Sequence, residues 1–349
     1  MEVLLLIALL VILLPLSGFL YQAAGSAADR RKFPPLGRLI DVKGHRLHLV
    51  EKGQGSPAVI FESGIAASSL NWTVIQAEVA RFTRTCTYDR AGLGWSDPAP
   101  APRIASRLVD ELHSLLAAAQ LPGPFVLVGH SFGGLLAQLH AVRNPHQVAG
   151  LVLIDPLPAA EWLNASQAQS RMLSRGVKLS RRGALLAQLG LVRFSLAMLS
   201  GGARKIPKLV ARLTSGHGDS TLSRLVGEVQ KMPPEVWPMV QAHWCQPKAF
   251  LGMAGYLESL PASAQQAAAL GDLPAIPVSI LSAANSTSAQ LSERDALAGR
   301  FGHGKHLIVK NCGHWIHLDQ PQVVIDAIRE IVELIRSQES CNPGPPIAF

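Results

Sequence analysis

The sequence predicts an α/β fold in which a mostly parallel sheet is covered by helices on both faces. Short apolar segments rich in β-branched residues alternate with amphipathic segments of helical length along most of the chain. An apolar strand at residues 125–128 runs directly into a glycine-rich turn and a helical segment. Between residues 155 and 277 the chain is far longer than a simple crossover requires, which indicates an inserted unit. The length of 349 residues allows one large or two ordinary domains.

The expected strands begin with a hairpin, because residues 38–42 and 45–51 flank the two-residue turn Lys43-Gly44. Further strands are expected at residues 58–62, 85–88, 125–128, 150–154, 277–281 and 306–310. Helices are expected at residues 71–82, 104–119, 135–142 and 323–335, and the second of these repeats its apolar residues with a period of 3.6. Because strands and helices alternate, we expect the strands to be parallel and the helices to cover the sheet on both sides.

The most informative motif is Gly-His-Ser-Phe-Gly at residues 129–133, placed between a strand and a helix. Glycine allows the sharp backbone turn that holds a serine hydroxyl above the end of a sheet, as in a nucleophile elbow. Ser131 is therefore the predicted nucleophile. The alternative is a glycine-rich turn before a helix, without chemistry.

His314 is the candidate general base, because it follows the last expected strand and precedes the last helix. A free imidazole titrates near neutrality and can take a proton from Ser131 and return it to a leaving group. The alternative role, a loop histidine that caps the following helix, is assigned here to His317. Asp319 and Pro321 are expected to form the cap and first turn of that helix.

Asp155 is the candidate acid that orients His314, because it directly follows the strand at residues 150–154. The loop after the strand at 277–281 contains no carboxylate at residues 282–287. Two readings stay open beside this one: Asp155 could only cap a turn before Pro156, and Glu293 or Asp295 could supply the acid instead.

Two backbone N–H groups are expected to bind the oxyanion that forms during attack. One belongs to Phe132 at the start of the elbow helix and the other to Ile65 in the loop after the third strand. This scheme requires no metal ion and no organic cofactor. The four cysteines, Cys86, Cys245, Cys312 and Cys341, are too few and too scattered to indicate a disulfide framework or a zinc site.

Residues 3–20 form an uncharged apolar run, and we expect residues 1–32 to be a single-pass membrane anchor followed by a linker. A secretory signal cleaved among the small residues 23–28 is the alternative, which would leave a secreted protein; no Lys or Arg precedes the run, as such a signal normally requires. The basic cluster at residues 30–32 favours a folded domain on the cytoplasmic side.

Residues 157–271 are expected to form a helical cap, with helices at 170–191, 207–213, 221–231 and 234–244. Trp162, Trp237 and Trp244 are candidate pocket walls or ordinary core residues. Residues 157–250 contain 13 Lys and Arg against 4 Asp and Glu, whereas the whole chain has a net charge of +8. We therefore expect the cap to face anionic headgroups or acidic or amphiphilic acyl substrates, with a solvated basic face as the alternative. No motif supports nucleic-acid binding.

These motifs resemble those of the α/β-hydrolase fold superfamily, in particular its capped AB hydrolase-1 branch. Beside the elbow, Y-D-R-A-G-L-G-W-S at residues 88–96 and G-H-W-I-H-L-D-Q-P at residues 313–321 resemble two further motifs of this branch. The sequence departs from the branch at Ser63-Gly64, where His-Gly is usual, and at Asn285 and Ser286, where the usual acid would lie. Asp155 resembles the alternative acid of some haloalkane dehalogenases and lipases.

The resemblance implies an α/β-hydrolase core at residues 33–156 and 272–337, with a helical cap inserted after strand six. The apolar run adds an N-terminal transmembrane helix, and residues 338–349 are left as a short tail. Anchor and resemblance together predict a membrane-anchored serine hydrolase that cleaves carboxylic ester or lipid-like acyl substrates through an acyl-enzyme. An acyltransferase, a cofactor-free haloperoxidase or a carbon–carbon hydrolase would use the same triad, and a catalytically silent receptor or scaffold would share the fold.

Overall fold

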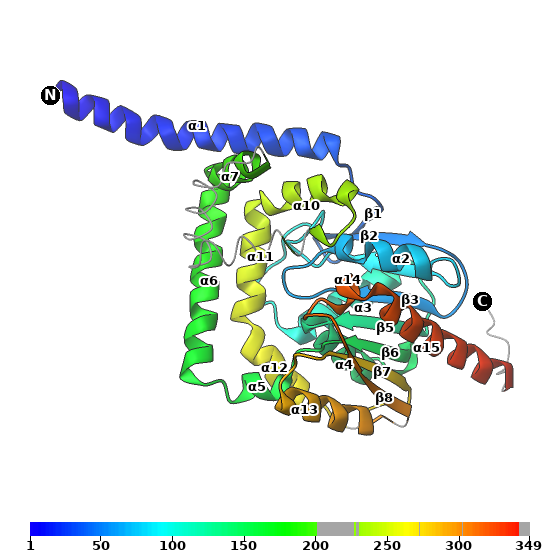
Figure 1. Ribbon diagram of the computed structural model, residues 1–349. Helices are drawn as coiled ribbons and strands as arrows, with labels where there is room; N and C mark the ends of the chain where they lie inside the picture. Colours follow the sequence, from blue (N-terminus) through cyan, green and yellow to red (C-terminus); the bar gives the residue numbers. More distant parts are fainter. Residues whose placement is uncertain (201–226, 228–229, 272, 302, 342–349) are drawn as a thin grey trace.

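The computed structural model describes residues 1–200, 227, 230–271, 273–301 and 303–341 (Figure 1). Eight strands form one sheet in the order β1-β2-β4-β3-β5-β6-β7-β8. β2 is antiparallel to its neighbours β1 and β4, and all the other neighbouring strands are parallel. The predicted, mostly parallel sheet is thus confirmed. The strands are β1 (Arg38–Asp41), β2 (Arg46–Lys52), β3 (Ala58–Glu62), β4 (Thr85–Tyr88), β5 (Phe125–His130), β6 (Val148–Ile154), β7 (Pro277–Ala283) and β8 (His303–Val309).

Helices cover both faces of the sheet, as predicted. One apolar cluster joins alternate residues of β5, such as Leu127, to α3 (Ala105–Ala118), α4 (Phe132–Arg143) and the end of α13 (Ser288–Gly299). A second cluster joins the intervening residues, such as Val128, to α2 (Thr73–Val79) and α15 (Pro321–Cys341). Successive side chains of a strand point to opposite faces, so a strand covered on both sides is buried throughout. Short helical turns complete the core: η1 (Ser69–Trp72), η2 (Pro145–Gln147) and α14 (Ile316–Asp319).

Several expected boundaries were wrong, and the largest difference is in the last helix, which was expected at residues 323–335 but spans Pro321–Cys341. The elbow helix α4 begins at Phe132 and not at residue 135, because Gly133 and Gly134 lie inside the helix. Glycine is needed there for close packing: a Cβ atom on Gly133 would collide with the Glu62 carbonyl group. The helix expected at residues 71–82 is the 3-10 turn η1 followed by the shorter α2, and β8 begins three residues before its expected start.

A helical insert lies between β6 and β7, where the sequence predicts one. The expected helix at residues 170–191 corresponds to α6, and that at residues 234–244 to η3 and α10. The helix expected at residues 207–213 and most of that at 221–231 lie outside the described residues. α5, α7, α11 and α12 were not expected, and α11 packs along α6 (Figure 1). The described helices of the insert are α5 (Ala159–Leu163), α6 (Gln167–Gln188), α7 (Leu191–Ser200), η3 (Pro234–Val236), α10 (Trp237–Trp244), α11 (Pro247–Glu258) and α12 (Leu260–Ala268).

α1 (Glu2–Lys32) is one continuous helix, and its segment Val11–Lys32 is long and apolar enough to cross a membrane. Its N-terminal half extends away from the rest of the molecule, whereas its second half passes over α7 and α10 (Figure 1). Gln22 and Ser26 are buried there against Cys245 and Gln246 of the insert. The part of residues 1–32 that follows the apolar run, which we expected to be a linker, is therefore helical and partly packed on the insert.

Candidate active site

Ser131 occupies the sharp turn between β5 and α4. Its backbone has φ 55° and ψ −119°, a region that a residue with a side chain adopts only when its surroundings enforce it. The Ser131 N–H group donates to the Ile154 carbonyl oxygen at 2.9 Å, and its own carbonyl accepts from the Gly134 and Leu157 N–H groups. These bonds fix the turn between two central strands, so the serine lies at the carboxyl end of the sheet.

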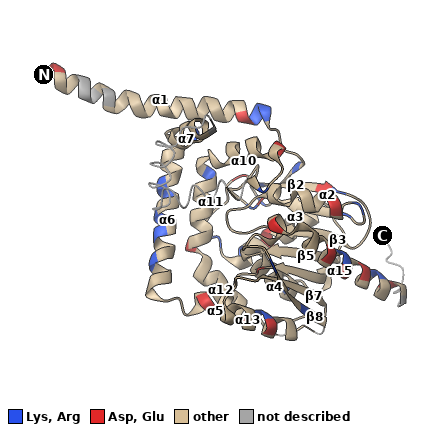
Figure 2. Cartoon of the chain, in the orientation of Figure 1, with Lys and Arg blue, Asp and Glu red and all other residues tan. Residues whose placement is uncertain are grey.

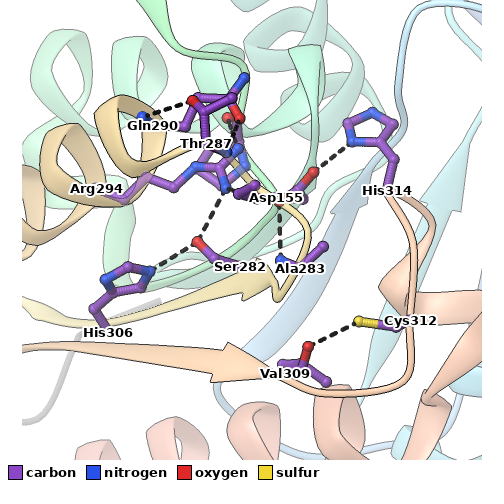
Figure 3. A network of polar contacts seen from close by, with 12 residues as sticks. Asp155, Ser282, Ala283, Thr287, Gln290, Arg294, His306, Val309, Cys312 and His314 are labelled. Carbon is purple, nitrogen blue, oxygen red and sulfur yellow. Dashed lines mark hydrogen bonds and ion pairs between the residues drawn. The ribbon is translucent and has the colours of Figure 1, made fainter.

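Asp155 and His314 meet at the same end of the sheet. His314 Nδ1 lies 2.6 Å from Asp155 Oδ2, although 159 positions separate the two residues (Figure 3). The Asp155 side chain is 9% exposed and that of His314 is 38% exposed, so the carboxylate is enclosed while the imidazole is accessible. A carboxylate bonded to Nδ1 leaves Nε2 of the ring available for proton transfer.

Arg294 of α13 holds the other oxygen of Asp155. Arg294 Nη1 donates to Asp155 Oδ1 at 2.7 Å, and the Ala283 N–H group donates to the same oxygen at 3.1 Å (Figure 3). Burial by itself would raise the pKa of the Asp155 carboxyl, but the hydrogen bond with His314 and the charge of Arg294 outweigh it and hold this pKa below its ordinary value. Arg294 was not predicted from the sequence. The only feature that could have indicated it is its position between the candidate acids Glu293 and Asp295.

The two reserve acids lie elsewhere. Glu293 Oε1 accepts from the Ala160 N–H group at 3.4 Å, and Asp295 Oδ1 lies 2.5 Å from His306 Nδ1. The same His306 ring bonds Ser282 through Nε2, which joins it to the Arg294 network (Figure 3). Of the three candidate carboxylates, Asp155 is thus the one that the structure brings against His314.

The two candidate oxyanion-hole segments lie beside the elbow. Phe132 is the first residue of α4, directly after Ser131, and its side chain is fully buried. Gly64, the residue before Ile65, lies so close to Ser131 that a Cβ atom on this glycine would be 3.7 Å from Ser131 Cβ. The backbone of the Ile65 loop therefore borders the serine, as the predicted role requires.

A second buried arginine, Arg90, ties this loop to the core. It forms an ion pair of 2.6 Å with Glu62 at the end of β3 and donates to the carbonyl oxygens of Ser63 and Gly64. Its guanidinium also lies 5.5 Å from the centre of the Phe132 ring. Arg90 thus contacts both segments that carry the candidate oxyanion amides. From the sequence, Arg90 was only part of the motif at residues 88–96, and no role was predicted for it.

His317 does not cap the last helix, as we had expected, but is buried beneath the site. Its ring stacks on Trp72 at a centroid distance of 4.6 Å and lies 4.4 Å from the ring of His130. Burial lowers the pKa of His317 to about 3, so the ring is neutral near pH 7. Burial also lowers the pKa of His130, whose Nε2 lies 2.9 Å from the His314 carbonyl oxygen. These rings form a neutral support for the His314 loop.

Asp319 also has a different role from the one expected. It ends the short α14 instead of capping α15, and its Oδ2 accepts from the Gly313 N–H group at 2.8 Å. Its Oδ1 forms an ion pair with Lys231 of the insert. Asp319 therefore anchors the backbone beside His314. Pro321 does begin the last helix, as predicted.

The three tryptophans pack in two places. Trp162 lies against the cluster that contains Phe132 and Tyr256, and Trp237 and Trp244 lie against the cluster around Leu70. A cavity of about 240 Å³ opens between α4, α5, α12 and α13; its lining includes Arg294 but neither Ser131 nor His314. None of these tryptophans lines it. Within the described ranges, no group of three or more His, Cys, Asp or Glu side chains has the arrangement of a metal site.

Fold and site together define an α/β hydrolase, and comparison with known proteins agrees. The pattern of the Alpha/beta hydrolase family matches residues 59–327, and the chain belongs to this family. An uncharacterized protein of Bacillus subtilis, YqjL, is 40% identical over 105 residues, which cover 30% of this chain and 42% of YqjL. The chain thus spans less than half the length of this relative.

Two further comparisons extend over most of the chain. The sn-1-specific diacylglycerol lipase ABHD11 of Mus musculus is 26% identical over 276 residues, which cover 78% of this chain and 80% of that protein. The structure of a candidate epoxide hydrolase from Pseudomonas aeruginosa superposes with a TM-score of 0.66 at 18% identity and covers 86% of this chain and 96% of that one. Hydrolases among the relatives support a hydrolase here as well.

Proposed function

We propose that this protein is a membrane-anchored serine hydrolase that cleaves carboxylic esters, among them lipid-like acyl esters, through an acyl-enzyme. The observation that carries the proposal is the 2.6 Å contact between His314 and Asp155. It lies at the carboxyl ends of the strands, where Ser131 also stands in its strained turn. Nucleophile, base and orienting acid then come from the ends of β5, β8 and β6, in the chain order Ser, Asp, His that this fold uses.

In the proposed mechanism, Ser131 Oγ attacks the ester carbonyl carbon while His314 Nε2 takes the hydroxyl proton. The carbonyl oxygen becomes an oxyanion, which the N–H groups of Ile65 and Phe132 stabilise. His314 returns the proton to the departing alkoxide as the carbon–oxygen bond breaks. A water molecule, deprotonated by His314, then attacks the acyl-enzyme and releases the carboxylic acid and free Ser131. Asp155 keeps the imidazole oriented and stabilises its charged form throughout.

The substrate class has two supports. The mouse relative that matches most of this chain is named a diacylglycerol lipase, whose substrate is a lipid ester. The apolar α1 would keep the site close to such lipids. An epoxide hydrolase of this fold requires an aspartate as nucleophile, whereas the elbow here presents Ser131. The fold shared with epoxide hydrolases therefore does not extend to their reaction.

Anchoring by an uncleaved α1 is part of the proposal. Its support is the packing of the second half of α1, where Gln22 Nε2 donates to the Cys245 carbonyl oxygen at 2.8 Å and Asp29 pairs with Arg193 at 2.6 Å. A peptidase acting among residues 23–28 would cut through this packed segment and separate Gln22 from its partner. This packing favours a retained anchor over a cleaved signal.

Fluorophosphonate labelling of the full chain in detergent, mapped by mass spectrometry, tests the proposal. We expect labelling at Ser131 and none in Ser131→Ala. Ser286→Ala is a matched control, because it changes a serine that lies beside Asp155 but has no proposed nucleophilic role. A folded wild-type protein that stays unlabelled would favour the scaffold alternative. If Ser131 is labelled, hydrolysis of p-nitrophenyl esters of increasing chain length would identify the acyl preference.

A further inference from the structure

The outward face of α6 carries a stripe of four cations. Arg171, Arg175, Lys178 and Arg182 are all exposed and follow one another at intervals of three or four residues, which places them on one side of a helix. The opposite side, with Ser180, Gly183, Ala184 and Ala187, is buried toward α11. α6 contains no Asp or Glu. The stripe is therefore a concentrated positive surface that points away from the protein.

α1 fixes the direction in which this stripe faces. Arg193 of α7 joins the end of α6 to α1, because its Nε donates to Gln22 Oε1 at 3.0 Å and its Nη2 pairs with Asp29. Gly18 of α1 packs directly against Leu189, one residue beyond α6. In Figure 2 the Lys and Arg residues of α6 lie on the side of the insert from which the N-terminal half of α1 extends. Anchor and stripe thus share one side of the molecule.

The length of the free half of α1 brings that side close to the bilayer. Fifteen residues precede Gly18 in the apolar run that starts at residue 3, and at 1.5 Å per residue they span about 22 Å. The hydrocarbon core of a bilayer is about 30 Å thick. The free half is therefore too short to cross alone, and a helix that crosses with the run that starts at residue 3 inserts to the point where Gly18 and Tyr21 touch the insert. The exposed side chains beside this contact would then enter the membrane–water interface: Leu185, Leu191 and Phe194.

We propose that the α6 stripe (Arg171, Arg175, Lys178 and Arg182) is a docking surface for anionic lipid headgroups that holds the insert flat against the membrane. This inference rests on the anchoring role proposed for α1 and deepens it, since α1 supplies attachment and α6 supplies orientation. Cations near an anionic leaflet are attracted by its surface potential over about a Debye length, so the contact depends on lipid charge and on salt. The insert then faces the phase in which a lipid-like substrate is dissolved.

The test measures the distance between α6 and the membrane in the full chain. A donor fluorophore is placed by a non-natural amino acid at Ser174, an exposed residue of α6, and nanodiscs carry a headgroup-labelled acceptor lipid. We expect energy transfer to rise when phosphatidylserine replaces part of the phosphatidylcholine, and to return to the lower level at high salt. Replacement of all four stripe residues by Gln should abolish this rise.

The control removes four exposed cations of the core instead, Lys43, Lys52, Arg81 and Lys310, and should keep the full rise. Transfer that is independent of phosphatidylserine, or a rise that survives in the stripe variant, would overturn the docking surface. A separate flotation assay with phosphatidylcholine vesicles tests the anchor. If neither the wild type nor the variants float with the vesicles, α1 is no anchor and the docking surface is overturned too. The hydrolase proposal is tested separately by Ser131 labelling in detergent, and its failure would leave the energy transfer unchanged.

Discussion

Two buried arginines flank the elbow and differ in the group that balances their charge. Arg90 lies on the side of the candidate oxyanion loop and pairs with Glu62, a residue outside the proposed triad. Arg294 lies on the side of the acid and pairs with Asp155 itself. Both side chains are 3–4% exposed, so each needs its carboxylate partner to remain buried as an ion.

This difference separates two kinds of support. Arg90 positions backbone, because it holds the carbonyls of Ser63 and Gly64, and its own charge is neutralised locally. Arg294 positions a side chain, and its charge acts on the proposed triad directly, since its counterion Asp155 is the carboxylate that contacts His314. Loss of Arg90 should therefore affect geometry and stability, and loss of Arg294 should affect the pH dependence.

The largest effect is expected when the Asp155 carboxylate, which contacts both Arg294 and His314, is removed. Asp155→Asn should lower kcat/KM for a p-nitrophenyl ester by about 10⁴-fold, because the amide no longer fixes the imidazole in the productive tautomer. Asp295→Asn is the matched control on the neighbouring helix, and we expect it to stay within a few-fold of wild type. Equal activity of Asp155→Asn and wild type would remove Asp155 from the mechanism.

The next effect concerns Arg90. Arg90→Met leaves the buried Glu62 without its cationic partner and should lower the free energy of unfolding by about 3–5 kcal/mol. The double variant Arg90→Met/Glu62→Gln should recover much of this stability in denaturant titrations. Its kcat/KM should nevertheless remain on the order of 100-fold low, since the oxyanion loop has lost its anchor. Recovery of activity together with stability would show that Arg90 is structural only.

A smaller effect is expected for Arg294→Gln, with kcat/KM about tenfold lower at neutral pH. Loss of this cation raises the pKa of Asp155 and removes a repulsion on protonated His314. Both changes move the acid limb of the pH profile to higher pH, by on the order of one unit. Arg300→Gln, at the end of the same helix, removes an exposed charge and serves as control. If the acid limb of the kcat/KM profile of Arg294→Gln is not shifted, Arg294 has no electrostatic role in catalysis.

The effect that is smallest near neutral pH, and grows as the pH falls, concerns stability and His317. The pKa of His317 is about 3 in the folded protein, below its ordinary 6.5, so the unfolded state binds more protons between these values. Its contribution to stability is complete above pH 6.5 and is lost as the pH falls toward 3, by at most about 1.4 kcal/mol per pH unit. His317→Phe should therefore make the decline in Tm below pH 6.5 shallower. The exposed His146→Gln should leave the decline unchanged.

Much of the core could be predicted from the sequence because its signals are local. The run at residues 125–128 and the following Gly-His-Ser-Phe-Gly specify a strand, a turn and a helix over fewer than twenty residues. The position of His314 after the last strand could be predicted for the same reason. The roles of His317 and Asp319 could not, because burial under Trp72 and a bond to the Gly313 N–H group depend on how loops fold back.

The sequence by itself determined the order of the core strands and the helices between them, the elbow at Ser131, the apolar start of α1 and the surplus of cations in the insert, since each depends on neighbouring residues. Only the tertiary structure decided that Asp155 and not Glu293 or Asp295 meets His314, that Arg90 and Arg294 support opposite sides of the site, and that α1 packs on the insert. These contacts join residues from 26 to 223 positions apart. Periodicity and turn chemistry carry no information about such distant partners, which packing and the pairing of buried charges select.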